Sequence, residues 1–460
     1  MSLAVVILAA GQGTRMRSRL PKVLHPIGGQ PMLVRVITAA RQLEANTICV
    51  VYGHHGAQVQ AAVAGHASVD WVEQLEQLGT GHAVQQAIPN IAGHDHTLVL
   101  YGDVPLIEVP TLQRLLAELE HAPLALLTMF PDSAQGYGRI VRGDGDMGAI
   151  ERIVEERDAT DAERRIPECN SGILAARTDA LIGWLERLRS NNAQHELYLT
   201  DVVGLAVGDG ERVASAQPDR IEEVLGVNDR VQLARLEREH QRLEAEALMR
   251  AGITLADPDR FDLRGSLTAG SDTSIDIDCV FEGRVVLGEG CRIGPHCVIR
   301  DAVIGERVEI RAFSVIEGAE IGDDCIIGPY ARLRPGAVLA EQVHVGNFVE
   351  IKNSRLGVGA KANHLSYLGD ATVGRRVNVG AGTITCNYDG ANKHHTTIGD
   401  DAFIGSNTAL VAPVTVGEGA TIGAGSTISA DVPPGTLALT RPEQRSLKHW
   451  KRPKKDAAKT

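Results

Sequence analysis

The stretch VIRDAVIGERVEIRAFSVIEGAEIGDDCIIG, residues 298–328, decides the fold of the second half of the chain. Its aliphatic residues recur at steps of five or six: Ile299, Ile304, Ile310, Ile316, Ile321 and Ile327. The same period covers 293–379 and resumes over 398–428, often with a glycine directly after the aliphatic residue. This period fits neither a helix face nor a hairpin. It is typical of the hexapeptide repeats of a parallel β-helix, and an irregular all-β sandwich would not keep it for so long.

Three such repeats make one coil of about 18 residues, so residues near that spacing stack on one another. The aliphatic residue points into the coil, and glycine permits the tight corners between its sides. Four cysteines stand two places before a position of the ladder, where small inward residues belong: Cys279, Cys291, Cys297 and Cys325. We expect these cysteines to fill the core in a reducing compartment, without disulfides.

Composition limits the class of protein. At 460 residues the chain has room for about two or three domains. The net charge of −12 argues against nucleic acid as a main partner. No apolar run approaches the roughly 18 residues of a membrane span, and no basic region precedes the apolar N-terminal run as in a secretory signal. A cytoplasmic protein is expected.

The first half opens with LAVVILAA, residues 3–10, a continuous apolar run that predicts a strand buried on both faces of a sheet. The turn GQGTRM, residues 11–16, follows, and then Pro21 and Lys22. A glycine-rich turn after a buried strand brings backbone N–H groups close to a phosphate, and Arg15 and Lys22 add cationic donors. The turn has neither the Gly-Lys-Ser/Thr of a Walker loop nor the third glycine of a dinucleotide fingerprint.

The spacing LAAGxGTRMx4PK over residues 8–22 resembles the signature of sugar-1-phosphate nucleotidyltransferases. With the hexapeptide ladder behind it, the chain from about residue 3 to 452 resembles the GlmU family. Members are bacterial enzymes with N-acetylglucosamine-1-phosphate uridyltransferase and glucosamine-1-phosphate N-acetyltransferase activities. The resemblance implies an α/β Rossmann-like nucleotidyltransferase domain followed by a left-handed parallel β-helix. It places the uridyltransferase at 1–228, a linker helix at 229–250, and the acetyltransferase with a basic tail at 251–460.

The first candidate site gathers around a predicted strand, 97–100, which ends in Tyr101, Gly102 and Asp103. Ligands of open α/β sheets bind beyond the carboxyl ends of strands, where a carboxylate can hold Mg²⁺; a lone aspartate is otherwise often a turn residue. The resemblance assigns Mg²⁺ to Asp103 and Asn228, and the sugar to Gly138, Glu155 and Asn170, polar residues that could otherwise belong to the surface. The implied UTP and UDP-N-acetylglucosamine contacts are Leu8, Ala9, Ala10, Gly11, Arg15, Lys22, Gln74, Gly79, Thr80, Tyr101, Gly102, Asp103, Gly138, Glu155, Asn170 and Asn228.

Gln74 and Gly79-Thr80 also have a plain structural interpretation. The run LGTGH, residues 78–82, favours a helix N-terminus with Thr80 as its cap. The resemblance instead places Gln74, Gly79 and Thr80 against uracil, where amide and backbone groups select the base. Both interpretations stay open from the residues alone.

The second candidate site lies where the ladder is most polar. Arg334 and Lys352 are separated by the length of one coil, which puts them on neighbouring coils of one side. Two stacked cations repel unless an anion joins them, so a sugar phosphate is favoured over a solvated basic stripe. His364 can accept a proton near neutral pH, and NHLSY, residues 363–367, matches the family stretch whose histidine is the general base. A double displacement through Cys386 is the rival, disfavoured because the amine can react directly.

The resemblance supplies the remaining contacts of this site. Those for glucosamine 1-phosphate are Arg334, Lys352, Tyr367 and Asn378. Those for acetyl-CoA are Ala381, Asn387, Tyr388, Ser406, Ala424 and Arg441. Residues 385–393 break the period and must loop out, and in the family this loop reaches a neighbouring subunit of a homotrimer. After Thr440 the chain is basic, either as a solubilising tail or as an attraction for the phosphates of coenzyme A.

The implied function is acetyl-CoA-dependent N-acetylation of glucosamine 1-phosphate, followed by Mg²⁺-dependent uridylyl transfer from UTP to N-acetylglucosamine 1-phosphate. The product feeds peptidoglycan and lipopolysaccharide precursors. One alternative is a single-activity sugar-1-phosphate nucleotidyltransferase with a regulatory or oligomerising solenoid, which would lack the set around His364. Another is a non-catalytic assembly subunit, which would show damage in residues 11–22 or at Asp103. The sequence has neither defect.

Overall fold

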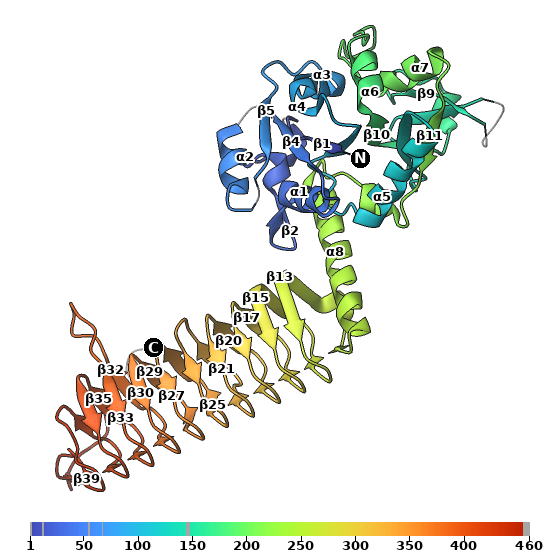
Figure 1. Cartoon of the computed structure of the whole chain (residues 1–460). Helices are drawn as coiled ribbons and strands as arrows, with labels where there is room; N and C mark the ends of the chain where they lie inside the picture. The colour runs from blue at the N-terminus through green and yellow to red at the C-terminus, as the bar shows by residue number, and fades with distance from the viewer. Residues whose placement is uncertain (1, 12, 54–55, 67, 144–147, 454–460) are drawn as a thin grey trace, which may run out of the picture. The chain divides into compact units, whose positions relative to one another are not determined.

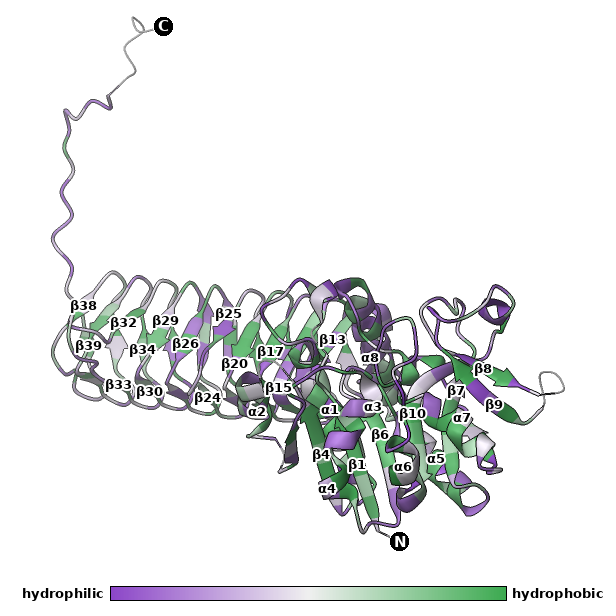
Figure 2. Ribbon diagram, turned by 90° about the horizontal axis from the view of Figure 1, so that it is seen from above, coloured by the Kyte–Doolittle hydropathy of each residue, from purple (hydrophilic) through white to green (hydrophobic). Residues whose placement is uncertain are grey.

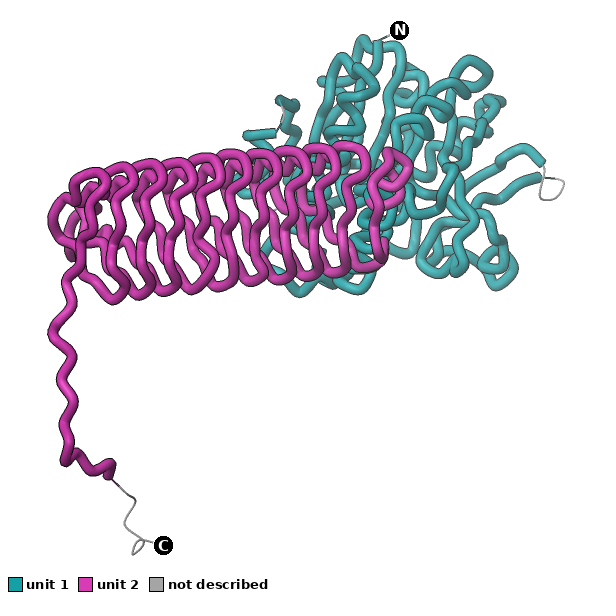
Figure 3. Tube along the Cα trace, turned by 90° about the horizontal axis from the view of Figure 1, so that it is seen from below, with its two compact units in different colours: residues 1–244 teal, residues 245–460 magenta. Residues whose placement is uncertain are grey.

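The computed structural model describes residues 2–11, 13–53, 56–66, 68–143 and 148–453 (Figure 1). Gln12 of the glycine-rich turn and the end of the basic tail, 454–460, lie outside the described residues. The chain divides into two compact units, residues 1–244 and 245–460 (Figure 3). Helix α8 (Arg230–Arg250) begins in the first unit and ends in the second. The domain bounds expected from the sequence stay a prediction.

Unit 1 is built on a mixed sheet with the strand order β11-β7-β10-β6-β1-β4-β5. Strand β1 pairs in parallel with β4 and β6, and β10 pairs antiparallel with β6 and β7. A hairpin, β8–β9, is attached to β10. The strands are β1 (Leu3–Leu8), β4 (Thr47–Tyr52), β5 (Asp70–Glu73), β6 (His96–Tyr101), β7 (Leu124–Met129), β8 (Arg139–Arg142), β9 (Ile150–Val154), β10 (Cys169–Arg177) and β11 (Val213–Ala216), with a small ribbon of β2 (Pro26–Ile27) and β3 (Gln30–Pro31).

Helices cover both faces of this sheet and make two cores. In β1, Val5 and Ile7 pack into one core, and Val6 and Leu8 pack into the other. Figure 2 shows β1, β4 and β6 in the green of hydrophobic residues. The prediction of a strand buried on both faces is therefore confirmed. The first core includes α1 (Met32–Gln42), α2 (Gly56–Val63) and α5 (Val109–Ala117), and the second includes α3 (Thr80–Gln86), α4 (Ile88–Ile91), α6 (Thr178–Leu185) and α7 (Asp201–Gly208).

Unit 2 is a parallel β-helix, seen as stacked coils in Figure 3. Strand pairing puts Ile293 on Ile310, Ile310 on Ile327, and Ile327 on Val345, so that each inward residue meets its counterpart one coil further along the chain. These inward side chains and the four predicted cysteines belong to one buried core. The predicted coil of about 18 residues is confirmed. The seven cysteines of the chain are free.

Each coil has three sides, which we number in chain order. Side 1 contains β12 (Thr254–Leu255), β14 (Ser274–Ile275), β16 (Arg292–Ile293), β19 (Glu309–Ile310), β22 (Ile326–Ile327), β25 (His344–Asn347), β28 (Lys361–His364), β31 (Asn378–Val379), β34 (Phe403–Ile404), β37 (Thr421–Ile422) and β39 (Leu437–Ala438). Side 2 contains β17 (Val298–Arg300), β20 (Val315–Glu317), β23 (Arg332–Leu333), β26 (Glu350–Lys352), β29 (Tyr367–Gly369), β32 (Ile384–Cys386), β35 (Ala409–Val411) and β38 (Thr427–Ile428). Side 3 contains β18 (Val303–Ile304), β21 (Glu320–Ile321), β24 (Val338–Leu339), β27 (Arg355–Leu356), β30 (Ala371–Val373), β33 (Thr396–Ile398) and β36 (Val414–Val416), and the long strands β13 (Phe261–Ala269) and β15 (Cys279–Leu287) run along sides 2 and 3.

We call the corner between sides 1 and 2 the first corner, and that between sides 2 and 3 the second corner. The predicted break in the ladder lies at the second corner, where residues 387–395 form an inserted loop between β32 and β33. Because of this loop, Val379 stacks on Ile404, a step in the sequence that is longer than one ordinary coil. A bridge between Tyr388 and Lys393 closes the loop as a hairpin. Within the described residues, no helix combines the length and hydropathy needed to cross a membrane.

Candidate active sites

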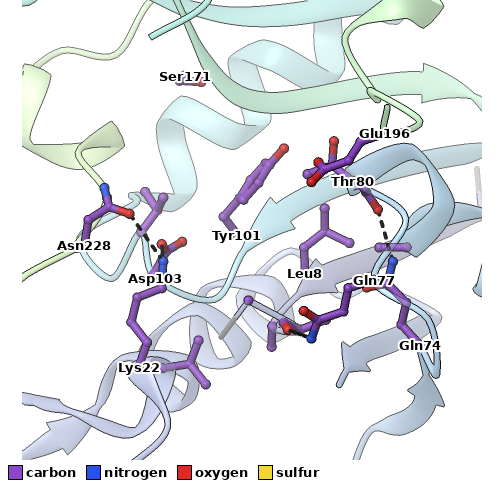
Figure 4. A pocket seen from close by; sticks show the side chains of 18 of the residues that line it. Leu8, Lys22, Gln74, Gln77, Thr80, Tyr101, Asp103, Ser171, Glu196 and Asn228 are labelled. Atoms are coloured by element: carbon purple, nitrogen blue, oxygen red, sulfur yellow. Dashed lines mark hydrogen bonds and ion pairs between the residues drawn. The ribbon is translucent and has the colours of Figure 1, made fainter. Parts of the chain in front are cut away.

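A cavity of about 460 Å³ lies in unit 1 at the carboxyl ends of β1 and β6. These strands are parallel neighbours, so the segments that follow them meet at one edge of the sheet. Eleven of the predicted nucleotide-binding residues line the cavity: Leu8, Ala9, Ala10, Gly11, Lys22, Gln74, Gly79, Thr80, Tyr101, Asp103 and Asn228. Figure 4 shows Lys22, Asp103 and Asn228 on one side of Tyr101, with Thr80, Gln77 and Gln74 on the other.

The cationic end of the cavity is organised around Lys22. Its ammonium group forms an ion pair with Asp103 and lies 3.5 Å from Oδ1 of Asn228. Arg15, although it does not line the cavity, donates to the same Asn228 oxygen at 3.0 Å. Gly13, with φ of +58°, lets the turn pass close to Lys22, since a Cβ there would lie 2.7 Å from the lysine Cβ. Gly102 lies in the chain between Tyr101 and Asp103 and is buried.

Asp103 and Asn228 fit a magnesium ion by their chemistry. Both present oxygen, the ligand that Mg²⁺ prefers, and both converge on a positive charge, the ammonium of Lys22. In the part of the chain that the structure describes, no group of three or more His, Cys, Asp or Glu could enclose a metal ion. An ion held here would therefore complete its shell with substrate oxygens and water, as Mg²⁺ commonly does.

At the opposite end of the cavity, the predicted uracil contacts are tied to backbone. The buried Gln74 donates from Nε2 to the Gly79 carbonyl at 3.1 Å. Gly79 has φ of +110°, and a Cβ there would lie 2.6 Å from the Leu197 carbonyl oxygen. Helix α3 does begin at Thr80, but its N-cap is Gly79, so the alternative of Thr80 as the cap is wrong. Thr80 instead accepts a hydrogen bond from the Leu199 N–H at 3.1 Å, because its side chain faces that segment.

The predicted sugar-binding residues lie beside one another next to the cavity. The Asn170 N–H donates to the Gly138 carbonyl at 2.8 Å, and a Cβ on Gly138 would lie 3.5 Å from Oε2 of Glu155. Thr200 donates to Oε1 of Glu155 at 2.9 Å. Burial raises the pKa of Glu155, which this hydrogen bond opposes. Gly138, Glu155 and Asn170 adjoin the cavity through their neighbours Tyr137 and Ser171, which line it.

Sequence reasoning missed several lining residues. Tyr137 precedes Gly138 and Ser171 follows Asn170, so each adjoins a residue that the sequence singled out. Glu196 lies in a stretch that precedes Thr200. Gln77, which donates from Nε2 to the Ala10 carbonyl at 2.8 Å, had no signal, because nothing in the sequence places it against the glycine-rich turn.

In the β-helix, His364 belongs to a column that runs along the first corner. Strand pairing puts Asn347 beside His364 on the next coil. Backbone hydrogen bonds continue the stack, from Gly382 N–H to His364, from Asn407 N–H to Ala381 and from Gly425 N–H to Ser406. The column therefore contains His364 and the predicted acetyl-CoA contacts Ala381, Ser406 and Ala424, and Arg441 lies close to Gly423 and Gly425 at its end. With neighbouring strands about 4.8 Å apart, it spans roughly 14 Å from His364 to Ala424.

The imidazole of His364 is exposed and has one fixed partner. Its Nδ1 lies 3.0 Å from Oδ1 of Asn347. A neutral imidazole that donates from Nδ1 to this amide oxygen has a free lone pair on Nε2. A groove of about 340 Å³ on side 1 is lined by His344, Asn347 and His364 among others. The arrangement suits a histidine that takes up a proton from a group in the groove.

Side 2 carries a group of cations. Arg334 and Lys352 lie on neighbouring coils, since Leu333 pairs with Ile351, and Arg334 donates to Glu350 at 2.8 Å. Lys393 of the inserted loop interacts with Lys352 and, with the charge of Arg334, lowers its pKa. Tyr367 also lies on side 2, where a Cβ on Gly369 would collide with the tyrosine oxygen. The residue that sequence reasoning missed here is Lys393, named only as part of the loop.

One chain does not gather the whole predicted set. Asn378 pairs with Lys361 at the beginning of side 1, whereas His364 is at the end of that side. Three residues of strand separate these positions, about 10 Å. Asn387 and Tyr388 lie on the inserted loop at the second corner, and the amide of Asn387 bonds to Asp370. The side 2 cations, the first-corner column and Asn378 thus occupy three different parts of the coil.

Three family models match separate parts of the chain. Residues 5–165 match the MobA-like NTP transferase domain, 263–362 the GMPPB C-terminal domain, and 395–430 the bacterial transferase hexapeptide (six repeats). The bifunctional protein GlmU of Azoarcus sp. (strain BH72) is 58% identical over 453 residues, covering 98% of this chain and 100% of the relative. The bifunctional protein GlmU of Aromatoleum aromaticum is 58% identical over 456 residues, covering 99% and 100%. The chain belongs to the GlmU family.

Membership of the GlmU family confirms the resemblance drawn from residues 8–22 and from the hexapeptide ladder. The predicted order of a nucleotidyltransferase sheet and then a parallel β-helix is confirmed as well. Among solved structures, a UDP-glucose pyrophosphorylase complexed with UDP-glucose is 15% identical, with a TM-score of 0.44 over 52% of this chain and 98% of that chain.

Proposed function

We propose that this GlmU-family chain makes UDP-N-acetylglucosamine by two reactions at two separate sites. Glucosamine 1-phosphate is first acetylated by acetyl-CoA in the β-helix, and N-acetylglucosamine 1-phosphate then receives a uridylyl group from UTP in unit 1. The observation that carries the proposal is the match, over nearly the full length of both chains, to relatives named bifunctional. The cavity of unit 1 and the column of unit 2 support it, because each offers the groups that one reaction needs.

Uridylyl transfer joins the phosphate of N-acetylglucosamine 1-phosphate to the α-phosphorus of UTP, and pyrophosphate leaves. The attacking phosphate is already an anion at neutral pH, so positioning and charge neutralisation are the main requirements. Lys22 lines the cationic end of the cavity, and Arg15 donates to Asn228 beside it, so both bind the triphosphate there. Asp103 and Asn228 would hold Mg²⁺, which when bound neutralises charge on the phosphate oxygens.

The rest of the cavity selects the two substrates. Gln74 and Gly79 present amide and backbone groups at one end, where they hydrogen-bond to uracil. Glu155 and Asn170 present oxygen acceptors and an amide next to the cavity, where they bind the hydroxyl and acetamido groups of the sugar. Tyr101 lies between these groups and the Lys22 cluster (Figure 4).

Acetyl transfer joins the amine nitrogen of glucosamine 1-phosphate to the thioester carbon of acetyl-CoA. The C–N bond forms, the C–S bond breaks, and coenzyme A leaves as the thiol. A protonated amine has no lone pair, so His364 removes a proton through Nε2 while Asn347 holds Nδ1. Arg334, Lys352 and Tyr367 hold the phosphate of the sugar. Acetyl-CoA lies along the column and against the inserted loop, with Ala381, Asn387, Tyr388, Ser406, Ala424 and Arg441 as its contacts.

The acetyltransferase site is shared between copies of the chain in a homotrimer. Asn378 lies on side 1 and the cations lie on side 2, so a neighbouring copy brings these parts together. The inserted loop, closed by the bridge between Tyr388 and Lys393, leaves the coil at the second corner. In the proposed trimer this loop reaches the neighbouring copy. The seven cysteines are free, which supports a reducing compartment, and we place the enzyme in the cytoplasm.

The experiment supplies the purified protein with Mg²⁺, UTP, acetyl-CoA and glucosamine 1-phosphate, and follows two products. Free thiol reports acetyl transfer, and pyrophosphate reports uridylyl transfer. The proposal predicts thiol release followed by pyrophosphate. If pyrophosphate forms only when N-acetylglucosamine 1-phosphate is supplied, and no thiol forms at all, the chain is a single-activity nucleotidyltransferase with an accessory β-helix.

A further inference from the structure

Asp370 is a buried carboxylate at the second corner, directly beneath the inserted loop. It follows β29 in a left-handed conformation, with φ of +48°, and its side chain is 8% exposed. Its N–H donates to the Lys352 carbonyl at 3.1 Å, and its own carbonyl accepts the Thr396 N–H at 3.1 Å. The backbone of Asp370 thus joins the coil that carries Lys352 to the strand that follows the loop.

Both carboxylate oxygens of Asp370 are occupied by side-chain amides. Oδ1 accepts from Nδ2 of Asn353 at 2.5 Å, and Oδ2 accepts from Nδ2 of Asn387 at 2.5 Å. Burial raises the pKa of Asp370, but the two amides and the charges of Lys393 and Lys352 outweigh it and hold the pKa below its usual value. The group is therefore an anion at neutral pH, and each of its two oxygens accepts one hydrogen bond from an amide.

Asp370 fixes the inserted loop at both ends. The loop begins at Asn387, whose side chain bonds to the carboxylate, and it ends before Thr396, whose N–H bonds to the backbone. Inside the loop, Asp389 and His394 form a contact of 2.7 Å that keeps the hairpin compact. A compact loop held at its base moves as one piece, so the position of Lys393 follows from the bonds at Asp370.

The carboxylate also balances the cations of side 2. Arg334 has a partner in Glu350, at 2.8 Å. Lys352 and Lys393 interact with each other, and Asp370 is the acidic group that raises the pKa of Lys352 against their repulsion. An anion at this place lets two ammonium groups stand close together before a phosphate arrives.

We propose that Asp370 is a positioning residue for acetyl transfer, which aims the Asn387 amide at acetyl-CoA and keeps Lys393 beside Lys352 for the sugar phosphate. The inference rests on the acetyltransferase activity proposed above. Asp370 touches neither substrate and acts through Asn387 and the loop. The inference adds to that function that one buried carboxylate keeps the inserted loop ordered, and this loop contacts both substrates.

The test is the variant Asp370→Asn, which keeps the shape of the side chain. An asparagine has one acceptor oxygen, one NH2 donor and no charge. One of the two amides must therefore lose its bond or turn its carbonyl toward the new NH2, and both bonds lose their charged acceptor. Loss of a hydrogen bond to a charged group predicts a KM for acetyl-CoA raised by about ten-fold or more. Pyrophosphate release from UTP and N-acetylglucosamine 1-phosphate should stay at the wild-type rate. A wild-type KM for acetyl-CoA in a folded variant overturns the inference.

The matched control is Asp301→Asn. Asp301 has a left-handed φ of +46°, and its carboxylate accepts the Arg284 N–H at 3.0 Å, away from the proposed site. This variant should leave the KM for acetyl-CoA and the KM for glucosamine 1-phosphate unchanged. If the wild-type protein releases no thiol, the proposed acetyl transfer itself is refuted. This outcome differs from an unchanged KM in Asp370→Asn, which refutes only the role of Asp370.

Two further variants separate positioning from general support of the coil. In Asp370→Asn combined with Asn387→Ala, the KM for acetyl-CoA should be no higher than in Asn387→Ala alone, because both changes remove one link. Fully additive effects contradict the inference. Asn353→Gly removes the other amide, keeps the left-handed backbone of this position (φ of +44°), and tests the same link if Asp370→Asn fails to fold. We expect it to raise the KM for acetyl-CoA about three-fold, since Asp370 loses one neutral partner; an unchanged KM contradicts the inference.

Discussion

At the scale of the residue, the positive charge at one end of the unit 1 cavity depends on the position of the Lys22 ammonium group. Lys22 pairs with Asp103 and lies 3.5 Å from Asn228, so two oxygens from distant segments share its charge. Gly13 lies close to Lys22 and fixes its place. Any other residue at position 13 would bring its Cβ too close to the lysine, and one of the two would have to move. We expect this charge to be needed most when negative charge is transferred between phosphates.

The variant Lys22→Met tests this role. It keeps the apolar stem and removes the charge, so kcat/KM for uridylyl transfer should fall by about 100-fold or more. Acetyl transfer should not change, because the β-helix contains its own cations. The measurement is steady-state pyrophosphate release, with Arg212→Met, an exposed arginine of the same unit, as the control. Equal losses in both variants would mean that general surface charge, and not Lys22, matters.

The orientation of His364 gives a second prediction. Asn347 lies 3.0 Å from Nδ1 and selects the tautomer with a free Nε2. In Asn347→Leu we expect kcat for thiol release to fall by about ten-fold, a part of the factor of about 100 or more that a general base supplies. Gln342→Leu, an exposed corner residue of the same β-helix, should be silent. A wild-type kcat in Asn347→Leu would show that His364 needs no such partner.

At the scale of the element, helix α8 is fastened to unit 1 by a buried histidine. His240 accepts a hydrogen bond at Nδ1 from Arg35 at 3.0 Å, and Glu237 of the same helix accepts the Gly28 N–H at 2.9 Å. Burial, and then the charge of Arg35, lower the pKa of His240 to about 3, with Glu244 also 3.7 Å away. The histidine is therefore neutral in the folded chain.

This contact predicts a dependence of stability on pH. The unfolded chain binds a proton at His240 below pH of about 6.5, but the folded chain does not until about pH 3. The free energy of unfolding should therefore decrease as the pH falls through this window, by about 1.4 kcal/mol per pH unit. The measurement is urea unfolding at pH 7 and pH 5, followed by the emission of Trp71 and Trp184. The slope should be smaller in His240→Asn, and an identical slope would contradict the prediction.

The elements were largely predictable from local patterns. Residues 3–10 and 97–100 were predicted as strands from local sequence, and the structure has β1 (Leu3–Leu8) and β6 (His96–Tyr101) there. The ladder predicted the coils because each inward residue repeats with a fixed step. The helix at Thr80 was predicted, but its cap was not, because Gly79 has a backbone conformation that the sequence does not reveal.

Most of the proposed site residues were assigned only through the resemblance, whereas the glycine-rich turn with Lys22 and the stacked Arg334 and Lys352 followed from the residues themselves. Ala381 and Ser406 are neighbours in the His364 column, yet the inserted loop separates them in the sequence by more than the length of one coil. No spacing rule of about 18 residues would have joined them. The contacts of Gln77 and Asp370 could not be predicted from the sequence either. Gln77 bonds to the Ala10 carbonyl and Asp370 bonds to Asn387, and both contacts depend on tertiary structure.

At the scale of the whole molecule, the two proposed sites lie in different compact units, and the proposed trimer completes one of them. We predict a solution mass of about three times 49.1 kDa by light scattering. Mixed trimers of His364→Ala and Asn378→Ala chains, refolded together, should regain acetyl transfer, because some sites then combine the intact residue of each chain. A monomeric mass, or mixed trimers that stay inactive, would show that one chain contains the complete site.

The central claim is that one chain carries two independent reactions, and a comparison of two variants tests it most directly. Asp103→Ala and His364→Ala are each assayed for thiol from acetyl-CoA and glucosamine 1-phosphate, and for pyrophosphate from UTP and N-acetylglucosamine 1-phosphate. Asp103→Ala should lose pyrophosphate release by about 100-fold or more and keep thiol release. His364→Ala should lose thiol release by about 100-fold or more and keep pyrophosphate release. If either folded variant loses both activities, or neither, the account of two separate sites is contradicted.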